Sequence, residues 1–138
     1  MQQDPKPDPQ NELKDKIDNY LQTVHALVGF MHFFRFECCA KCTPCRVGTN
    51  RLYEIISAIS EGRGTPQSLD ELQTLGQDME LLSNCGLGQT ASVAVRDILK
   101  HFRPEIEQHI YARTCPAGVC KMPELSPAEL AAYEESIR

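Results

Sequence analysis

Cysteines carry most of the chemistry that this sequence offers, and three of them follow one another at a regular spacing. Cys39, Cys42 and Cys45 form a Cys-x2-Cys-x2-Cys run, and Cys85 lies further along the chain beside a glycine-rich turn. Such a run lets one tight loop present three thiolates to a single cubane cluster, with the fourth ligand supplied from elsewhere. The spacing is typical of [4Fe–4S] proteins, so we expect these four cysteines to hold one cluster and the chain to transfer electrons.

Two other uses of the same cysteines stay open. A structural zinc site usually takes two separated cysteine pairs, or cysteine pairs with histidine pairs, and a triplet followed by a lone cysteine fits that pattern poorly. A disulfide framework or a thiol switch is the other alternative, although the seven cysteines are an odd number. The polar N-terminus shows no apolar segment of a secretory signal. Because thiolate clusters need a reducing compartment, the sequence predicts a cytoplasmic location.

Helices must position these ligands, because apolar residues recur at helical spacing and no segment alternates like a strand. A first helix is predicted from Leu13 to Val28 and leads into the cysteine loop. A second begins near Arg46 and stops at the Gly-Arg-Gly-Thr-Pro breaker over 62–66. Its core face is expected to consist of Leu52, Ile55, Ile56 and Ile59. Folding back at the breaker would bring Cys45 and Cys85 to the same end.

The second half of the chain also predicts helices. Ser68 is the expected N-cap of a third helix, with Glu71 completing a capping box. The turn over 85–88 should end that helix, and Pro104 should kink or restart a fourth. Ser126 begins a short last helix. The apolar stripe of the third helix is expected to be Leu69, Leu72, Leu75, Met79 and Leu82, and that of the fourth Val95, Ile98, Leu99 and Phe102.

The predicted fold is therefore all-α, a small helical bundle of the four-helix type with an iron–sulfur loop at one end. We divide the chain into a flexible N-terminal tail over 1–10, a helical iron–sulfur domain over 11–122 and a C-terminal helical tail over 123–138. The net charge of −5 gives no reason to expect nucleic acid or an anionic membrane surface as a partner. The most apolar stretch, 26–36, is too short to span a bilayer and contains His32 and Arg35.

Residues around the cysteine loop suit an anionic cluster. The N–H groups at the start of the second helix would point toward it, and hydrogen bonds to cluster sulfurs raise the reduction potential. Lys41 and Arg46 add positive charge, or are simply solvated surface. Gly86 and Gly88 would allow either a close backbone approach or a positive φ.

The motifs are more specific than the spacing alone. The runs 37–49, 83–91 and 101–103 resemble the C-terminal iron–sulfur domain of the flavin-bearing, NADH-oxidising subunit of respiratory complex I. Related subunits of NAD-linked hydrogenases and formate dehydrogenases contain the same domain. The resemblance covers about residues 20 to 120. It implies a helical bundle whose one [4Fe–4S] cluster takes an electron from reduced flavin and passes it to further clusters. Carried over residue by residue, the ligands are Cys39, Cys42, Cys45 and Cys85.

The chain departs from the family in three respects. Ala40 stands where the family usually has glycine, which would strain the loop if that position needs a positive φ. Cys38 stands in place of serine and is read as a small buried residue, with a ligand role as the minor alternative. No glycine-rich nucleotide-binding signature is present. We therefore expect a separate small iron–sulfur subunit that works with a flavin- and NAD(P)H-binding subunit and other iron–sulfur subunits, and that cannot oxidise NADH alone.

A second group of ligand-type residues closes the domain. Cys115 and Cys120 bracket a Cys-Pro-Ala-Gly-Val-Cys run that resembles a segment of the multimeric hydrogenase members of the family, and His109 precedes it. These three could form part of a tetrahedral zinc site, with Cys38 or a partner residue as the fourth ligand. A free thiol pair and a disulfide are the alternatives. The remaining histidines, His25, His32 and His101, are read as ordinary helix residues.

Two hypotheses of function follow. The first is an electron-transfer subunit with one [4Fe–4S] cluster in a multi-subunit, NAD(P)H-linked oxidoreductase. The second is a non-redox module in which the cysteines hold zinc and the bundle acts as a scaffold or sensor. Colour distinguishes them, because anaerobically purified cluster protein is brown whereas zinc protein is colourless.

Overall fold

The computed structural model describes residues 24–116, 118 and 120–138, and all regular structure within them is helical. The helices are α2 (Val24–Glu37), α3 (Thr43–Ser60), α4 (Pro66–Leu82), α5 (Gly86–His101), α6 (Arg103–Glu107), the π-helical η1 (Gln108–Ala112) and α7 (Pro127–Ser136). This confirms the all-α prediction. The predicted tail over 1–10 and the part of the first predicted helix before Val24 lie outside the described residues.

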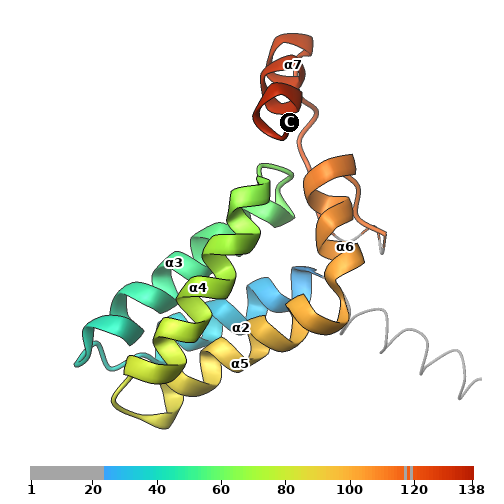
Figure 1. The fold of residues 1–138 in the computed structure, drawn as a ribbon. Helices are drawn as coiled ribbons and strands as arrows, with labels where there is room; N and C mark the ends of the chain where they lie inside the picture. Colours follow the sequence, from blue (N-terminus) through green and yellow to red (C-terminus); the bar gives the residue numbers. More distant parts are fainter. Residues whose placement is uncertain (1–23, 117, 119) are drawn as a thin grey trace, which may run out of the picture.

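Helices α2, α3, α4 and α5 form the bundle (Figure 1), with α4 packed on α5, α2 on α3, and α3 on α4. The predicted core face of α3 is confirmed, since Leu52, Ile55, Ile56 and Ile59 are all buried. Met31 of α2, Met79 of α4 and Val95 of α5 are buried in the same core. The bundle therefore ties the segments before and after each cysteine loop into one packed unit.

The order of the helices places two connections at the same end of the bundle. The α2–α3 loop and the α4–α5 turn lie together there, and the α3–α4 connection lies at the opposite end (Figure 1). Gly62 has a φ of 75°, which lets the chain reverse directly after α3. The predicted α3–α4 hairpin is thus formed, and it returns the chain from Cys45 to Cys85.

Several predicted boundaries were wrong by a few residues. Helix α4 begins at Pro66 with Thr65 as its N-cap, and Ser68 is the third helical residue in a capping box with Thr65. Proline at the first helical position already has the φ that a helix needs, so the helix starts three residues earlier than expected. Glu71, the expected capping partner, instead pairs with Arg51 of α3.

Two further expectations about these helices are corrected. Leu82 is 61% exposed, because it is the last residue of α4 and extends beyond the packed stripe. Gly86 begins α5, so the turn that ends α4 consists of residues 83–85. The α3 helix begins at Thr43, which places Cys45 within its first turn.

The C-terminal part packs against the α3–α4 connection. Pro104 lies in the first turn of α6, as the predicted restart requires, and η1 follows without a break. Arg113 has a φ of 50° and ends η1, and its guanidinium donates hydrogen bonds to the carbonyls of Gly62 and Pro123. Helix α7 starts at the predicted Ser126 cap, and its Tyr133 hydroxyl donates to the carbonyls of Gly64 and Ile110.

None of the described helices is both long enough and apolar enough to cross a bilayer.

Candidate metal centre

Two helices of the bundle begin at predicted ligands. Cys42 is the N-cap of α3, and Cys85 is the N-cap of α5. The first turn of a helix carries N–H groups without intrahelical partners and the positive end of the helix dipole. The N-termini of α3 and α5 therefore lie at the cysteine sulfur atoms, where their positive dipole ends would stabilise an anionic group.

Backbone contacts join the two cysteine-bearing segments. The backbone N–H of Asn84, and next that of Cys45, stabilise the thiolate of Cys42 and lower its pKa. Asn84 directly precedes Cys85, so the α4–α5 turn is held against the start of α3. Hydrogen bonds from backbone N–H groups to sulfur are also the usual support of a metal-bound thiolate.

Cys45 lies deepest in this group. It is 4% exposed, and the pKa of its thiol is raised to about 12. Burial is the largest cause, and the nearby Cys38, Cys42 and Cys85 raise this pKa further. A metal-free chain therefore keeps the proton on Cys45, and binding of a cationic metal would displace it. Because three other thiols influence this one sulfur, the α2–α3 loop, the start of α3 and the α4–α5 turn contribute to one cluster of cysteine side chains.

Gly88 brings the first turn of α5 against the cysteines. A Cβ atom built on Gly88 would lie 2.4 Å from Oγ of Ser83 and 3.1 Å from Cβ of Cys45. Such contacts are too short for a side chain, so the close approach expected from the sequence is present at this glycine. Gly86 has nothing within 4 Å of the corresponding position, and neither glycine has a positive φ.

The loop between α2 and α3 places its two adjacent cysteines differently from the sequence-based assignment. The Sγ atoms of Cys38 and Cys45 are 3.3 Å apart, whereas Cys39, the predicted ligand, is exposed. Ala40 has a φ of 60°, so the strain anticipated for this position is present. Cys38 thus lies among the cysteines of the main group and not with the second group, for which the sequence suggested it as a fourth ligand.

The surface around this end is partly apolar. Phe36 at the end of α2 and Leu81 at the end of α4 are each 80% exposed. Cys85 is exposed as well, and Lys41 and Arg46 are solvated.

The second predicted group of ligands does come together. One ligand atom each of His109, Cys115 and Cys120 lies within 4.8 Å of the others. Tetrahedral zinc with sulfur and nitrogen ligands would hold these atoms roughly 3.5–3.8 Å apart, so the group needs only a small contraction.

The imidazole of His109 has the tautomer that a metal ligand needs. Its Nδ1 lies 2.7 Å from the carbonyl oxygen of Glu105, which can only accept, so Nδ1 carries the proton. Nε2 is then an acceptor; it is buried and has no hydrogen-bond partner within the described part of the chain. Burial also lowers the pKa of His109, which keeps the ring neutral. A buried ring nitrogen with a free lone pair is typical of metal sites.

Cys120 is anchored between helix ends. Burial raises the pKa of its thiol to about 11, while the hydroxyl of Ser60 and the backbone N–H of His25 favour its thiolate. Ser60 is the last residue of α3, whereas Cys45 is in its first turn. At 1.5 Å per residue these two positions are about 22 Å apart, so the two groups lie at opposite ends of the helix. A side chain of Cys38 in contact with Cys45 cannot also reach the second group.

Some contributors to these groups were not predicted from the sequence. The Glu105 carbonyl lies four residues before His109, so helical spacing could have identified it. The roles of Asn84, Ser60 and the backbone of His25 depend on tertiary packing and leave no local signal.

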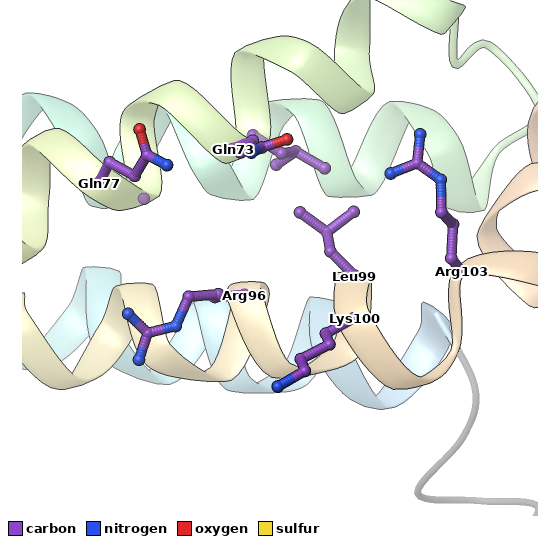
Figure 2. Close-up of a pocket in the computed structure, with 8 residues that line it drawn as sticks. Gln73, Gln77, Arg96, Leu99, Lys100 and Arg103 are labelled. Atoms are coloured by element: carbon purple, nitrogen blue, oxygen red, sulfur yellow. The ribbon is translucent and has the colours of Figure 1, made fainter.

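A groove between α4 and α5 is separate from both groups. Gln73 and Gln77 line it from α4, and Arg96, Leu99 and Lys100 from α5 (Figure 2). Arg96 is paired with Glu80, and none of the lining residues is a cysteine, a histidine or a carboxylate. The groove therefore offers no ligands for a metal.

Comparison with known proteins places most of this chain in one family. The family model described as "NADH-ubiquinone oxidoreductase-F iron-sulfur binding region" matches residues 25–109. The chain is 43% identical over 91 residues to the NADP-reducing hydrogenase subunit HndC of Solidesulfovibrio fructosivorans, covering 66% of this chain and 19% of that protein. It is 34% identical over 94 residues to the mitochondrial NADH-ubiquinone oxidoreductase 51 kDa subunit of Neurospora crassa, covering 68% of this chain and 19% of that protein.

A solved structure extends the comparison to the fold. The crystal structure of an NAD+-reducing [NiFe]-hydrogenase in its H2-reduced state contains a chain that matches with a TM-score of 0.62 and 36% identity. The match covers 81% of this chain and 19% of the other. This chain therefore corresponds to about a fifth of the length of such relatives. Because the family model matches more than half of its residues, the chain belongs to the family of NADH-ubiquinone oxidoreductase-F iron–sulfur binding regions.

Proposed function

We propose that this protein is an electron-transfer subunit that carries one [4Fe–4S] cluster. The single observation that supports this most is the grouping of Cys42 and Cys45 at the start of α3 with Cys85 at the start of α5. The fourth thiolate comes from the adjacent pair Cys38 and Cys39, of which the sequence motif selects Cys39. A bound cluster of this type supplies one-electron redox chemistry.

The residues of the chain perform three tasks in this proposal. The buried faces of α2, α3 and α5 fix the separation of the ligand segments. The N–H groups of Asn84 and Cys45 favour the thiolate form of Cys42. The two helix N-termini stabilise negative charge, which favours acceptance of an electron.

The partner assignment is supported by the names of two relatives, which refer to NADH, NADP and ubiquinone. We infer that the chain relays electrons between a flavin-bearing, NAD(P)H-binding partner and further redox centres of a multi-subunit oxidoreductase. The chain corresponds to only about a fifth of those relatives, so the nucleotide chemistry belongs to other polypeptide segments in this proposal. Thiolate ligation also favours a reducing compartment such as the cytoplasm.

Anaerobic reconstitution tests the cluster. We expect about four iron and four sulfide per chain, a brown colour and an EPR signal after reduction. Cys42→Ala and Cys85→Ala should lose the cluster, whereas Cys115→Ala, at the other end of α3, should retain it. Full iron content in the first two variants would contradict the ligand assignment. A colourless protein with zinc at these cysteines would support the scaffold or sensor alternative.

A binding experiment tests the partner assignment. We expect the isolated, cluster-loaded chain to bind neither flavin nor NADH, and to be reduced by NADH only after addition of a flavin-bearing partner protein. The absorbance bleaching of the cluster on reduction is the readout. Stoichiometric flavin on the purified chain would contradict the proposed division of labour.

We further propose a zinc ion at His109, Cys115 and Cys120. The proximity of the three ligand atoms and the unpartnered Nε2 of His109 support it. Zinc with nitrogen and sulfur ligands is tetrahedral, so a partner residue or water would complete the site. The site would tie the chain after η1 to the end of α3.

Metal analysis of variants tests this second site. Because the two groups are about 22 Å apart along α3, a Cys42→Ser variant should keep about one zinc. Cys115→Ser should lose the zinc and keep the iron. Absence of zinc from both the wild-type protein and Cys42→Ser would leave the free-thiol alternative.

A further inference from the structure

Cys38 and Cys39 are neighbours in sequence, and the sulfur of Cys38 contacts that of Cys45. The Sγ atom of Cys38 lies 3.3 Å from that of Cys45, and Cys38 is half-buried. Cys39 belongs to the regular Cys-x2-Cys-x2-Cys spacing, yet it is exposed. The sequence motif and the conformation therefore select different residues for the first ligand position.

Cys38 is placed as a ligand would be. It is one of the three cysteines whose proximity affects Cys45, the others being Cys42 and Cys85. The backbone N–H of Ala40 also donates a hydrogen bond to its sulfur, at 3.4 Å. Four thiols from three segments thus surround one region without Cys39, and backbone N–H donors already support two of them.

The loop that selects between the two sulfurs is short and strained. Residues 38–40 lie between α2 and α3 without regular structure, and Ala40 has a φ of 60°. A left-handed alanine is unfavourable, so relaxation at Ala40 would favour another arrangement of the residues before it. Adjacent residues of a loop point in different directions, so a local rotation of these few residues would exchange which sulfur faces Cys45.

We propose that Cys38 and Cys39 are interchangeable ligands, so that this chain closes its cluster site with either sulfur. The inference rests on the proposed [4Fe–4S] cluster and adds a second ligation state to it. In each state one thiol of the pair is left uncoordinated: Cys39 at the surface, or Cys38 beside Cys45.

Single alanine variants test the exchange. Alanine is chosen because a serine oxygen can itself ligate iron. After anaerobic reconstitution, Cys38→Ala and Cys39→Ala should each keep about four irons per chain and give EPR spectra that differ from one another. The double variant should lose the cluster or retain a three-iron form. Cys42→Ala is the matched control, because no neighbouring cysteine can replace it, and it should behave like the double variant.

The opposite results overturn the proposal. If Cys39→Ala holds no cluster while Cys38→Ala has the wild-type EPR spectrum, Cys39 is the only first ligand. The mirror-image result makes Cys38 the only one. A wild-type chain that takes up no iron at all rejects the proposed function itself and is thereby distinguished from failure of the exchange.

Circular dichroism shows whether each variant is folded. Alkylation of the cluster-loaded wild-type protein gives a second test that does not depend on the folding of any variant. In the wild-type protein, anaerobic treatment with iodoacetamide followed by peptide mapping should label both Cys38 and Cys39 partially. Complete labelling of one and full protection of the other shows a single fixed ligand and overturns the proposal.

Discussion

Ala40 carries a side chain in a backbone conformation that glycine adopts without steric cost. Its φ of 60° lies in the left-handed region, which costs an L-residue about 1–2 kcal/mol. The sequence could indicate this position, because the resemblance described above implies glycine there. The consequence is that the strain is located in the loop that presents the ligand pair.

Replacing Ala40 by glycine should therefore stabilise the metal-free protein by about 1 kcal/mol. Urea denaturation under reducing conditions measures this change. Ala58→Gly is the matched control, because the same substitution inside α3 should destabilise the protein by about 1 kcal/mol. A loss of stability in both variants would show that the loop is not strained at Ala40.

Gly88 and Gly86 offer a second matched pair. A methyl group on Gly88 would meet Ser83 and Cys45, whereas one on Gly86 meets nothing within 4 Å. We expect Gly88→Ala to lower stability by about 1–3 kcal/mol through overpacking and to impair cluster retention. Gly86→Ala should be nearly neutral in both respects. Denaturation and iron content after gel filtration measure the two effects, and equal behaviour of the variants would contradict the packing argument.

At the scale of helices, the sequence predicted which helices form and which of their faces are buried better than it predicted where each helix begins and ends. The buried stripe of α3 follows from apolar spacing alone, because one face of a helix must pack. The start of α4 did not follow, since both Thr65 and Ser68 are capping residues and Pro66 decides between them. Leu82 was expected in the core because its spacing fits, but the helix ends where no neighbour covers it.

The candidate sites show the same division. Spacing predicted a common site for Cys42, Cys45 and Cys85 and a second for His109 with the two C-terminal cysteines, and the structure brings each set together. Spacing also selected Cys39, whereas the structure places Cys38 beside Cys45, because which of two adjacent residues turns inward depends on the dihedral angles of the loop over 38–42. The local sequence pattern thus predicts which residue types could be ligands, whereas tertiary packing determines which of their side chains turn toward the site.

Tyr133 attaches the last helix to the rest of the protein. Its hydroxyl donates to the carbonyls of Gly64 and Ile110, and the Arg113 guanidinium lies 5.6 Å from its ring centroid. Tyr133→Phe removes the hydroxyl and leaves carbonyls without their donor, which should cost about 1–2 kcal/mol. We expect faster proteolysis within 123–138 in this variant. Tyr111→Phe, at an exposed ring, is the control and should be cleaved like the wild type.

On the scale of the whole molecule, α3 separates two ligand groups by about 22 Å. Sites this far apart without shared partners usually contribute additively to stability, within about 0.5 kcal/mol. In the metal-loaded protein, the losses of unfolding free energy caused by Cys42→Ala and Cys115→Ala should therefore sum to that of the double variant. A deviation well above about 1 kcal/mol would reveal coupling through the bundle.

Cys39 and Cys85 are exposed at the end of the bundle where α2 and α4 also expose the apolar side chains of Phe36 and Leu81. This exposure affects how the protein can be handled and how it assembles. Dissolved oxygen has access to any edge of the cluster that is exposed to solvent. Each exposed cysteine ligand therefore shortens the lifetime of the cluster in air. The isolated, cluster-loaded chain should therefore lose its brown colour when it is exposed to air. Any protein that covers this end of the bundle should slow that loss. The half-life of the brown colour in air therefore reports whether another protein is bound at this end, even when that protein has not been identified.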